Sequence, residues 1–315
     1  MSANRLGRRG VLIAALLVAW VTLLGAGRRA GDGGEERKAS SIHVCVKESG
    51  RVRIVAPDAK CRSGEMREEW SITVPQGPAV PTTCPPDAVL TGTACLDKYE
   101  ASLWRTTYPV VIERIKAGAV TMENLKSASA TQLGLVAGDL AAAGCPATGT
   151  GCADIFAVSI PGVKPARFLT WFQALAAARN AAKRLPTNAE WQAAALGTPD
   201  PGASPGPSDC NTKGDGPDLT GTRAACVSGV GAFDMVGNVS EWVADWVPRS
   251  TACAGEVFAG TGDANCLAGV GSASGAGALI RGGGFGSGVE AGVFAVDGRN
   301  PPSFENAAVG LRGAR

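Results

Sequence analysis

Ten cysteines are the feature that most constrains how this chain of 315 residues can fold. They stand at positions 45, 61, 84, 95, 145, 152, 210, 226, 253 and 266. Thiols pair and persist as disulfides in an oxidising compartment, and the grouping favours pairs of sequential neighbours, each closing one loop. Counting alone leaves the connectivity open. Zinc is the competing interpretation, but the chain has no Cys-x-x-Cys pair and its one histidine is His43, so zinc is disfavoured.

The amino-terminal segment predicts export. Arg5, Arg8 and Arg9 precede an apolar stretch from Gly10 to Gly27, which is typical of a signal peptide. The stretch is also nearly long enough to span a bilayer, so residues 1–27 are either a cleaved signal or a retained anchor. Contact with a membrane is expected only through an uncleaved segment. We therefore expect a protein of the periplasm, the cell surface or the exterior.

The net charge of +2 comes from the amino terminus. Residues 1–40 hold seven basic and three acidic side chains, which leaves 23 basic and 25 acidic ones beyond them. A nearly neutral folded part lacks the basic surface that nucleic-acid binding requires. Nucleic acid is therefore excluded as an expected partner.

Alternating apolar residues predict a small antiparallel β module over residues 41–74, after a polar linker at residues 28–40. A spacer rich in proline and glycine follows at residues 75–83. The module resembles the short strand unit that precedes collagen-like repeats in bacterial surface and fibre-type proteins. That resemblance leaves a trimeric stalk open, and the oligomeric state is not fixed by the sequence.

Two helices are expected within the remaining domain, residues 84–315. One begins after a Thr170 cap and places Trp171, Leu175 and Ala178 on one face. The other has a capping box formed by Thr187 and Glu190. Gly197 is expected to end this second helix.

The rest of this domain is expected to be irregular. An alanine-rich segment between Thr106 and Leu140 predicts one or two further helices. Two glycine-rich stretches, residues 197–222 and 253–278, predict long loops held by disulfides.

Four motifs in fixed order carry a family resemblance. They are "FLTWFQALAAARNAAKRLPTNAEWQAAALG", "GAFDMVGNVSEWVADW", "LIRGGGFG" and "VGLRGAR". Together they resemble the formylglycine-generating sulfatase-modifying factor family, also grouped as the sulfatase-modifying factor, EgtB and PvdO superfamily. The resemblance implies an α+β domain related to the C-type lectin fold, irregular and stapled by disulfides, behind the small antiparallel β module.

The resemblance also implies a structural calcium ion at the "GAFDMVGNVSEW" turn, residues 231–242. The implied ligands are the carbonyl oxygens of Asp234, Gly237 and Val239 with the side chain of Glu241. Hard oxygen ligands from a flexible turn suit calcium. The alternative is that these polar residues satisfy turn amides and surface pairs while the tryptophans pack a core face.

The family's oxidases hold copper through two cysteines, and the resemblance places those positions at Ser287 and Gly292. Thiolates are the soft ligands that Cu(I) prefers, so no copper is expected, and with His43 alone no iron either. The cleft candidates are Arg281, Gly284, Asp297 and Arg299. Cys253 and Cys266 remain open as a substitute thiol pair.

We therefore expect an exported bacterial protein whose domain lacks the copper-binding cysteines and serves as a binding or structural module. Its partner would be an unidentified protein or glycan. The alternative is a divergent oxidoreductase of the same family that acts on a protein cysteine or uses another metal.

Overall fold

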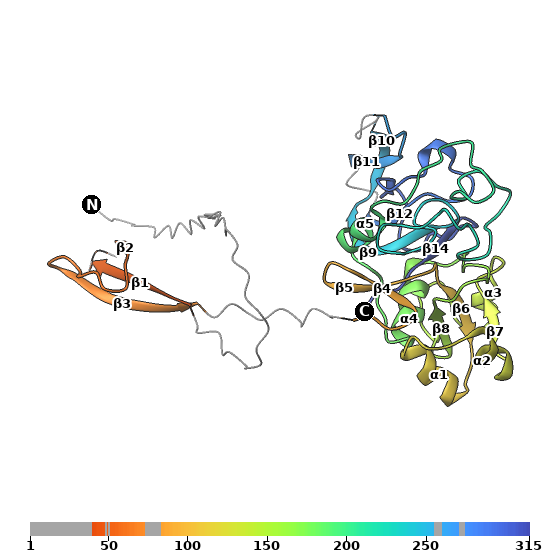
Figure 1. The fold of residues 1–315 in the computed structure, drawn as a ribbon, viewed down its shortest axis with the longest axis horizontal. Helices are drawn as coiled ribbons and strands as arrows, with labels where there is room; N and C mark the ends of the chain where they lie inside the picture. Colours follow the sequence, from red (N-terminus) through yellow and green to blue (C-terminus); the bar gives the residue numbers. More distant parts are fainter. Residues whose placement is uncertain (1–39, 48, 50, 73–82, 255–259, 271–274) are drawn as a thin grey trace, which may run out of the picture. The chain divides into compact units, whose positions relative to one another are not determined.

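The residues that can be described in the computed structural model are 40–47, 49, 51–72, 83–254, 260–270 and 275–315. The chain divides into two units, Met1–Gln76 and Gly77–Arg315, as Figure 1 shows. Three expected segments lie outside the described residues. They are the signal or anchor, most of the linker, and residues 75–82 of the spacer. Within the described part, no helix combines the length and the apolar character needed to cross a membrane.

The first unit is a three-stranded antiparallel sheet, as its alternating sequence predicts. Its strands are β1 (Ser40–Lys47), β2 (Val52–Val55) and β3 (Glu65–Ile72), in the order β2-β1-β3. Val44 and Cys45 on the central strand are fully buried. A disulfide from Cys45 to Cys61 ties the β2–β3 connection to that strand.

The second unit begins with two small sheets. The hairpin of β4 (Ala88–Thr91) and β5 (Ala94–Asp97) comes first. Strand β6 (Ser102–Arg105) then pairs with both β7 (Thr131–Leu133) and β8 (Ile155–Val158), antiparallel in each case. Strand β8 is buried along its whole length, which fits its uninterrupted apolar sequence.

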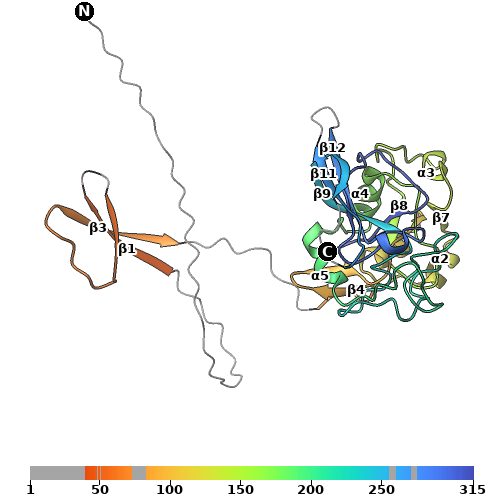
Figure 2. The same ribbon diagram turned by 90° about the horizontal axis from the view of Figure 1, so that it is seen from above.

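The largest sheet of the second unit is mixed and six-stranded. Its order is β10-β11-β13-β12-β9-β14, and Figure 2 shows β9, β11 and β12 side by side. The strands are β9 (Ser240–Pro248), β10 (Ser250–Ala254), β11 (Asn265–Val270), β12 (Ala276–Arg281), β13 (Val296–Asp297) and β14 (Val309–Leu311). The expectation of a long loop over residues 253–278 is therefore wrong, because β11, the end of β10 and the start of β12 occupy much of that stretch.

The helices are short. They are α1 (Pro109–Lys116), α2 (Met122–Ser127), α3 (Asp139–Ala142), α4 (Trp171–Asn180), α5 (Asn188–Ala195) and the 3-10 turn η2 (Gly288–Glu290). The segment between Thr106 and Leu140 thus starts three helices, where one or two were expected.

Capping boxes begin both helices expected from the sequence. Thr170 caps α4 together with Gln173, and Thr187 caps α5 together with Glu190, as the Thr187 spacing predicts. Gly197 follows α5 with a φ of 82°. The most buried face of α4 is formed by Ala174, Ala177 and Ala178, while Trp171 and Leu175 pack at its edge.

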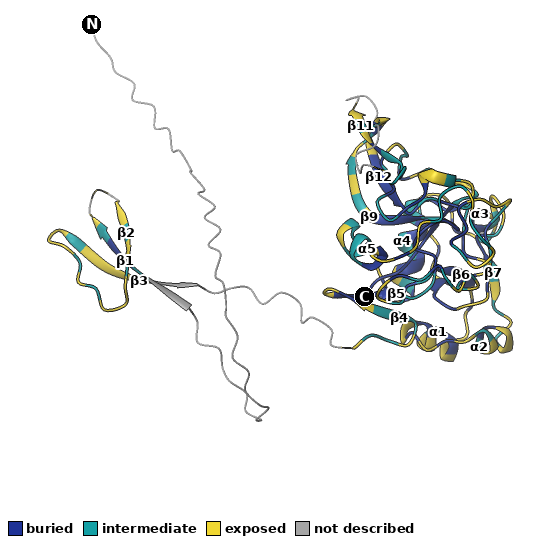
Figure 3. Ribbon diagram, turned by 45° about the horizontal axis from the view of Figure 1, so that its top comes forward, coloured by how far each residue is buried: buried dark blue, intermediate teal, exposed yellow. Residues whose placement is uncertain are grey.

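One apolar core joins α4 to the sheets. Trp242 of β9 and Leu311 of β14 are fully buried in a cluster with Leu169 and Ile155. Figure 3 shows buried residues around α4 and β6, and exposed residues on α1 and α2. Fully burying one leucine or isoleucine contributes about 1.5–3 kcal/mol, so this cluster is a principal source of stability.

All ten cysteines form disulfides, and every pair joins the sequential neighbours that the spacing favoured. The pairs are Cys45–Cys61, Cys84–Cys95, Cys145–Cys152, Cys210–Cys226 and Cys253–Cys266. The last of these links β10 to β11. Residues 197–222, by contrast, contain no strand or helix, as expected.

Candidate functional site

The turn at residues 231–242 lies in the buried interior, immediately before and within the start of β9. Asp234, Gly237 and Asn238 all have positive φ values, of 59°, 75° and 57°. A side chain at residue 237 would overlap the backbone of Asn211. Glycine is therefore required at this position both for its conformation and for the close approach of the second segment.

Four charged side chains surround this turn. Glu100, Asp234, Glu241 and Arg312 are at most 3% exposed. Arg312 Nη2 donates to Glu241 Oε1 at 2.8 Å, and Trp191 Nε1 donates to Glu241 Oε2 at 2.7 Å. The carboxylate proposed from the sequence as a metal ligand is thus already held by a guanidinium and an indole.

Glu100 holds the turn from the other side. Its Oε1 accepts the amide N–H of Val239 at 2.9 Å, and its other oxygen accepts the side-chain amide of Asn238. Asp234 Oδ2 accepts the amide N–H of Gly221 at 2.7 Å. Every carboxylate of the cluster therefore satisfies a backbone amide or a polar side chain.

The cluster carries an excess of negative charge, with three carboxylates against one guanidinium. Burial, and then the charges of Asp234 and Glu241, raise the pKa of Glu100 well above its usual value. Burial also raises the pKa of Asp234 to about 6. A bound cation would offset this excess.

Two main-chain carbonyl oxygens of the buried turn also favour a bound cation. Within the described part of the chain, the carbonyls of Asp234 and Gly237 accept no hydrogen bond, although both residues are buried. Buried carbonyls are nearly always paired, and calcium accepts main-chain oxygens in flexible geometry. The carbonyl oxygens are of the kind that a hard cation takes, but both oxygens of Glu241 already accept hydrogen bonds from Arg312 and Trp191. Calcium at this turn stays a prediction.

A cleft of about 320 Å³ lies against the large sheet, where residues of β9, β12, β13 and β14 line it. Three of the residues singled out from the sequence line it: Ser287, Asp297 and Arg299. Arg299 Nη2 pairs with Asp297 Oδ2 at 2.8 Å. Phe304, Asn300 and Asn306 also line the cleft.

Arg281 and Gly284 do not line this cleft. Arg281 is 4% exposed, its guanidinium lies 4.7 Å from the ring centroid of Trp191, and it donates to the carbonyl oxygen of Val293 at 3.2 Å. Burial lowers its pKa to about 10. Arg281 is therefore a buried side chain at the end of β12, and it does not face this cleft as expected from the sequence.

The two positions that the resemblance assigns to copper ligands do not fit copper. Ser287 Oγ accepts the amide N–H of Gly284 at 3.0 Å, as in a local turn. At residue 292 the added Cβ of any side chain would overlap the carboxylate of Asp263. The chain thus lacks both thiolates, and an acidic side chain lies where one of them would project.

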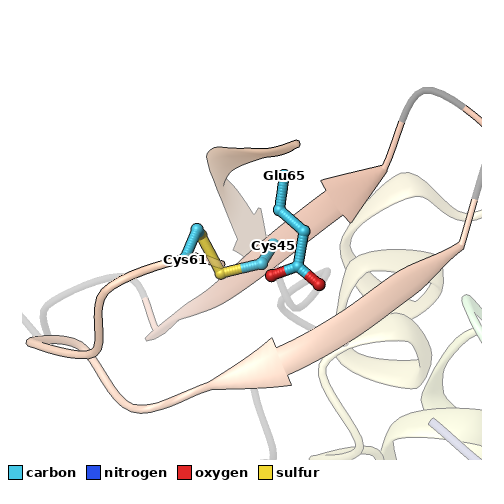
Figure 4. A group of neighbouring side chains, drawn as sticks. All are labelled: Cys45, Cys61 and Glu65. Atoms are coloured by element: carbon cyan, nitrogen blue, oxygen red, sulfur yellow. A yellow bond between two sulfur atoms is a disulfide. The ribbon is translucent and has the colours of Figure 1, made fainter. Parts of the chain in front are cut away.

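No other cysteine supplies a thiolate. Cys253 and Cys266 are joined to each other, so the interpretation of this pair as substitute ligands is wrong. In the described part, Cys45, Cys61 and Glu65 come close enough to resemble a metal site, and Figure 4 shows them. Their two sulfurs form a disulfide, and the carboxylate pairs with Arg53 at 2.8 Å instead.

The sequence reasoning missed three residues of these sites: Glu100, Arg312 and Asp263. Arg312 stands alone among apolar and glycine residues in "VGLRGA", and an isolated charge in such a stretch was an available signal for a buried ion pair. Glu100 and Asp263 carry no comparable signal, because their partners lie far away in the sequence.

The fold and the site define a disulfide-stapled α+β domain built around a charged internal turn. The family described as "Sulfatase-modifying factor enzyme 1-like domain" matches residues 114–315. The chain belongs to this family. It is 38% identical over 103 residues to the formylglycine-generating enzyme of Thermomonospora curvata, a match that covers 26% of this chain and 33% of that enzyme.

Several solved structures are similar in outline. The P3c variant of the Major Tropism Determinant has a TM-score of 0.42 at 15% identity, covering 89% of this chain and 73% of its own. Treponema denticola variable protein 1 has a TM-score of 0.31 at 20% identity, covering 49% of this chain and 71% of its own. These superpositions are too loose to bear on function.

Proposed function

We propose that this chain is an exported protein whose sulfatase-modifying-factor domain binds a ligand and does not oxidise cysteine. The observation that carries the proposal is the contact between Asp263 and Gly292. It fills the space of one copper ligand with a carboxylate, which is a hard ligand poorly suited to Cu(I). The five disulfides remove every alternative thiolate and support export, because disulfides persist in oxidising compartments.

The cleft is the proposed binding surface. Asp297 and Arg299 offer both signs of charge, Asn300 and Asn306 offer amides, and Phe304 offers an aromatic ring. Binding sites commonly combine an apolar surface with a few fixed polar groups. Such a lining suits a neutral polar partner, either a protein loop or a glycan.

We further propose a structural calcium at the 231–242 turn. The unpaired carbonyls of Asp234 and Gly237 and the excess negative charge around them support it. Its place in the buried turn would keep the start of β9 fixed, and β9 carries one edge of the cleft through Ser240.

An oxidation assay tests the non-catalytic half of the proposal. The full chain would be loaded with Cu(I) and mixed in air with a peptide that carries one cysteine, and the loss of thiol would be followed. The enzyme of Thermomonospora curvata serves as the positive control. We expect no copper-dependent loss with this chain. Copper-dependent loss would instead establish the alternative, a divergent oxidoreductase of the family.

A binding screen tests the other half. The labelled full chain would be applied to glycan and peptide arrays beside a variant with Arg299→Ala and Asn300→Ala. We expect signals on one array that the variant loses, because both side chains line the cleft. Equal signals from the two proteins, or none from either, would contradict a binding role for this cleft.

A further inference from the structure

A second cavity, of about 350 Å³, lies between the loop that follows α5 and the turn that precedes β11. Asp200, Pro201 and Gly202 line it from the first segment, and Gly260, Thr261 and Asp263 line it from the second. It is thus bounded by two acidic side chains, and no basic residue is part of its lining.

Asp263 is held firmly on one side only. The residue is 7% exposed, and its Oδ2 accepts the amide N–H of Phe294 at 2.7 Å. Its Oδ1 is buried and has no hydrogen-bond partner among the residues that the structure describes. Leaving a buried carboxylate oxygen without a partner costs folding free energy. This atom therefore indicates a bound ligand that the protein itself does not supply.

Asp200 faces the same space. Its Oδ1 accepts the amide N–H of Gly202 at 3.0 Å. Burial, and then the neighbouring charge of Asp263, raise the pKa of Asp200. Ionised carboxylates are acceptors only, so two that face each other require a proton or a cation between them.

The side chains that the structure describes do not supply that cation. Within the described residues neither Asp200 nor Asp263 forms a salt bridge. Arg281 is the basic side chain whose charge reaches Asp263, but its guanidinium donates to the carbonyls of Val293 and Phe294. The two carboxyl groups of the cavity are therefore without a directly paired basic side chain in the described part of the chain.

We propose that this cavity binds a hard divalent cation of the calcium class through the carboxylates of Asp200 and Asp263. Calcium takes six to eight oxygen ligands in adaptable geometry, and carboxylates, main-chain carbonyls and water can complete such a shell in a cavity of this size. The ion would join the loop after α5 to the turn before β11. It would also fix the carboxylate that lies against Gly292.

This site shares no residue with the 231–242 turn and does not depend on the proposed function. The test uses the full secreted chain, freed of metal with a chelator and titrated with calcium by calorimetry. Asp200→Asn and Asp263→Asn remove a charge but keep an oxygen for Gly202 and Phe294. Asp209→Asn is the matched control, because Asp209 lies in the same loop and accepts the amide of Gly206 but does not line the cavity.

We expect both cavity variants to bind about one calcium fewer than the wild type and the Asp209→Asn control. Melting temperature gives a second readout. In chelator the cavity variants should melt at or above the wild type, because like-charge repulsion is relieved, and in calcium they should melt below it. The proposal is overturned if both variants bind as much calcium as the wild type. It is also overturned if their melting temperatures differ from that of the wild type by the same amount with and without calcium. Either result would show that the two carboxyls share a proton.

Discussion

At the residue scale, the chemistry of this chain depends on charges whose partners are distant in sequence. Arg312 and Glu241 are 71 positions apart, and Glu100 and Val239 are 139 apart. The sequence identified the turn and Glu241, but pattern and spacing act over short ranges and carry no information on such pairs. The same limit hid Asp263, whose contact with Gly292 depends on how the β10–β11 hairpin folds.

Arg312→Met tests how much the buried charged cluster around the 231–242 turn contributes to the free energy of unfolding. Removing one partner of a buried ion pair leaves an uncompensated charge and typically costs about 3–5 kcal/mol. We expect a loss of that size in the free energy of unfolding, measured by urea denaturation. Arg299→Met is the control, because its pair with Asp297 is half exposed and such pairs contribute about 0–1 kcal/mol. Equal losses for the two variants would contradict a central role for Arg312.

At the element scale, the sequence predicted the features that depend on nearby residues. It did not predict the strands that depend on pairing between distant segments. The Thr170 cap, the Thr187 capping box and the disulfide pairs join residues at most 16 positions apart, and the structure contains them as predicted. The strands over residues 253–278 were missed because their glycine-rich sequence lacks strand propensity. Their stability comes from neighbours such as the parallel pairing of β11 with β13, since strand preference depends strongly on context.

Thr187→Ala tests the cap of α5. The Thr187 hydroxyl accepts the amide N–H of Glu190 at 3.2 Å, and loss of an N-cap costs about 1 kcal/mol, within a range of about 0.5–2. We expect that decrease in unfolding free energy by chemical denaturation. Thr187→Ser, which retains a hydroxyl, should lie close to the wild type. An alanine variant as stable as the serine variant would mean that the cap contributes nothing measurable.

At the scale of the whole molecule, the second unit closes on itself at its carboxyl end. Arg315 and Cys95 exchange backbone hydrogen bonds of 2.8 and 3.1 Å, and Lys183 pairs with Asp87 and Asp97 at 2.8 and 2.6 Å in the interior. The last residues thus join the first hairpin to the end of α4. This closure holds the segment after β14, which supplies Arg312, beside the 231–242 turn.

Removing calcium should weaken this whole unit. A ligand that binds only the folded state at about 100 times its Kd stabilises it by about 2.7 kcal/mol. We expect the melting temperature of the Asp200→Asn protein, which isolates the 231–242 turn, to rise on adding calcium and to fall again in chelator. Magnesium is the control, because it demands a stricter octahedral shell. Identical melting temperatures in calcium and in chelator would contradict a structural calcium at this turn.

The central claim is that this family member has no thiolate copper centre. The most direct test is a count of free thiols and bound metals on the full chain, secreted into an oxidising compartment, purified without chelator and then offered Cu(I). We expect no free thiols, bound calcium and negligible copper, because all ten cysteines are paired and Asp263 lies against Gly292. Two free thiols together with stoichiometric copper would contradict it.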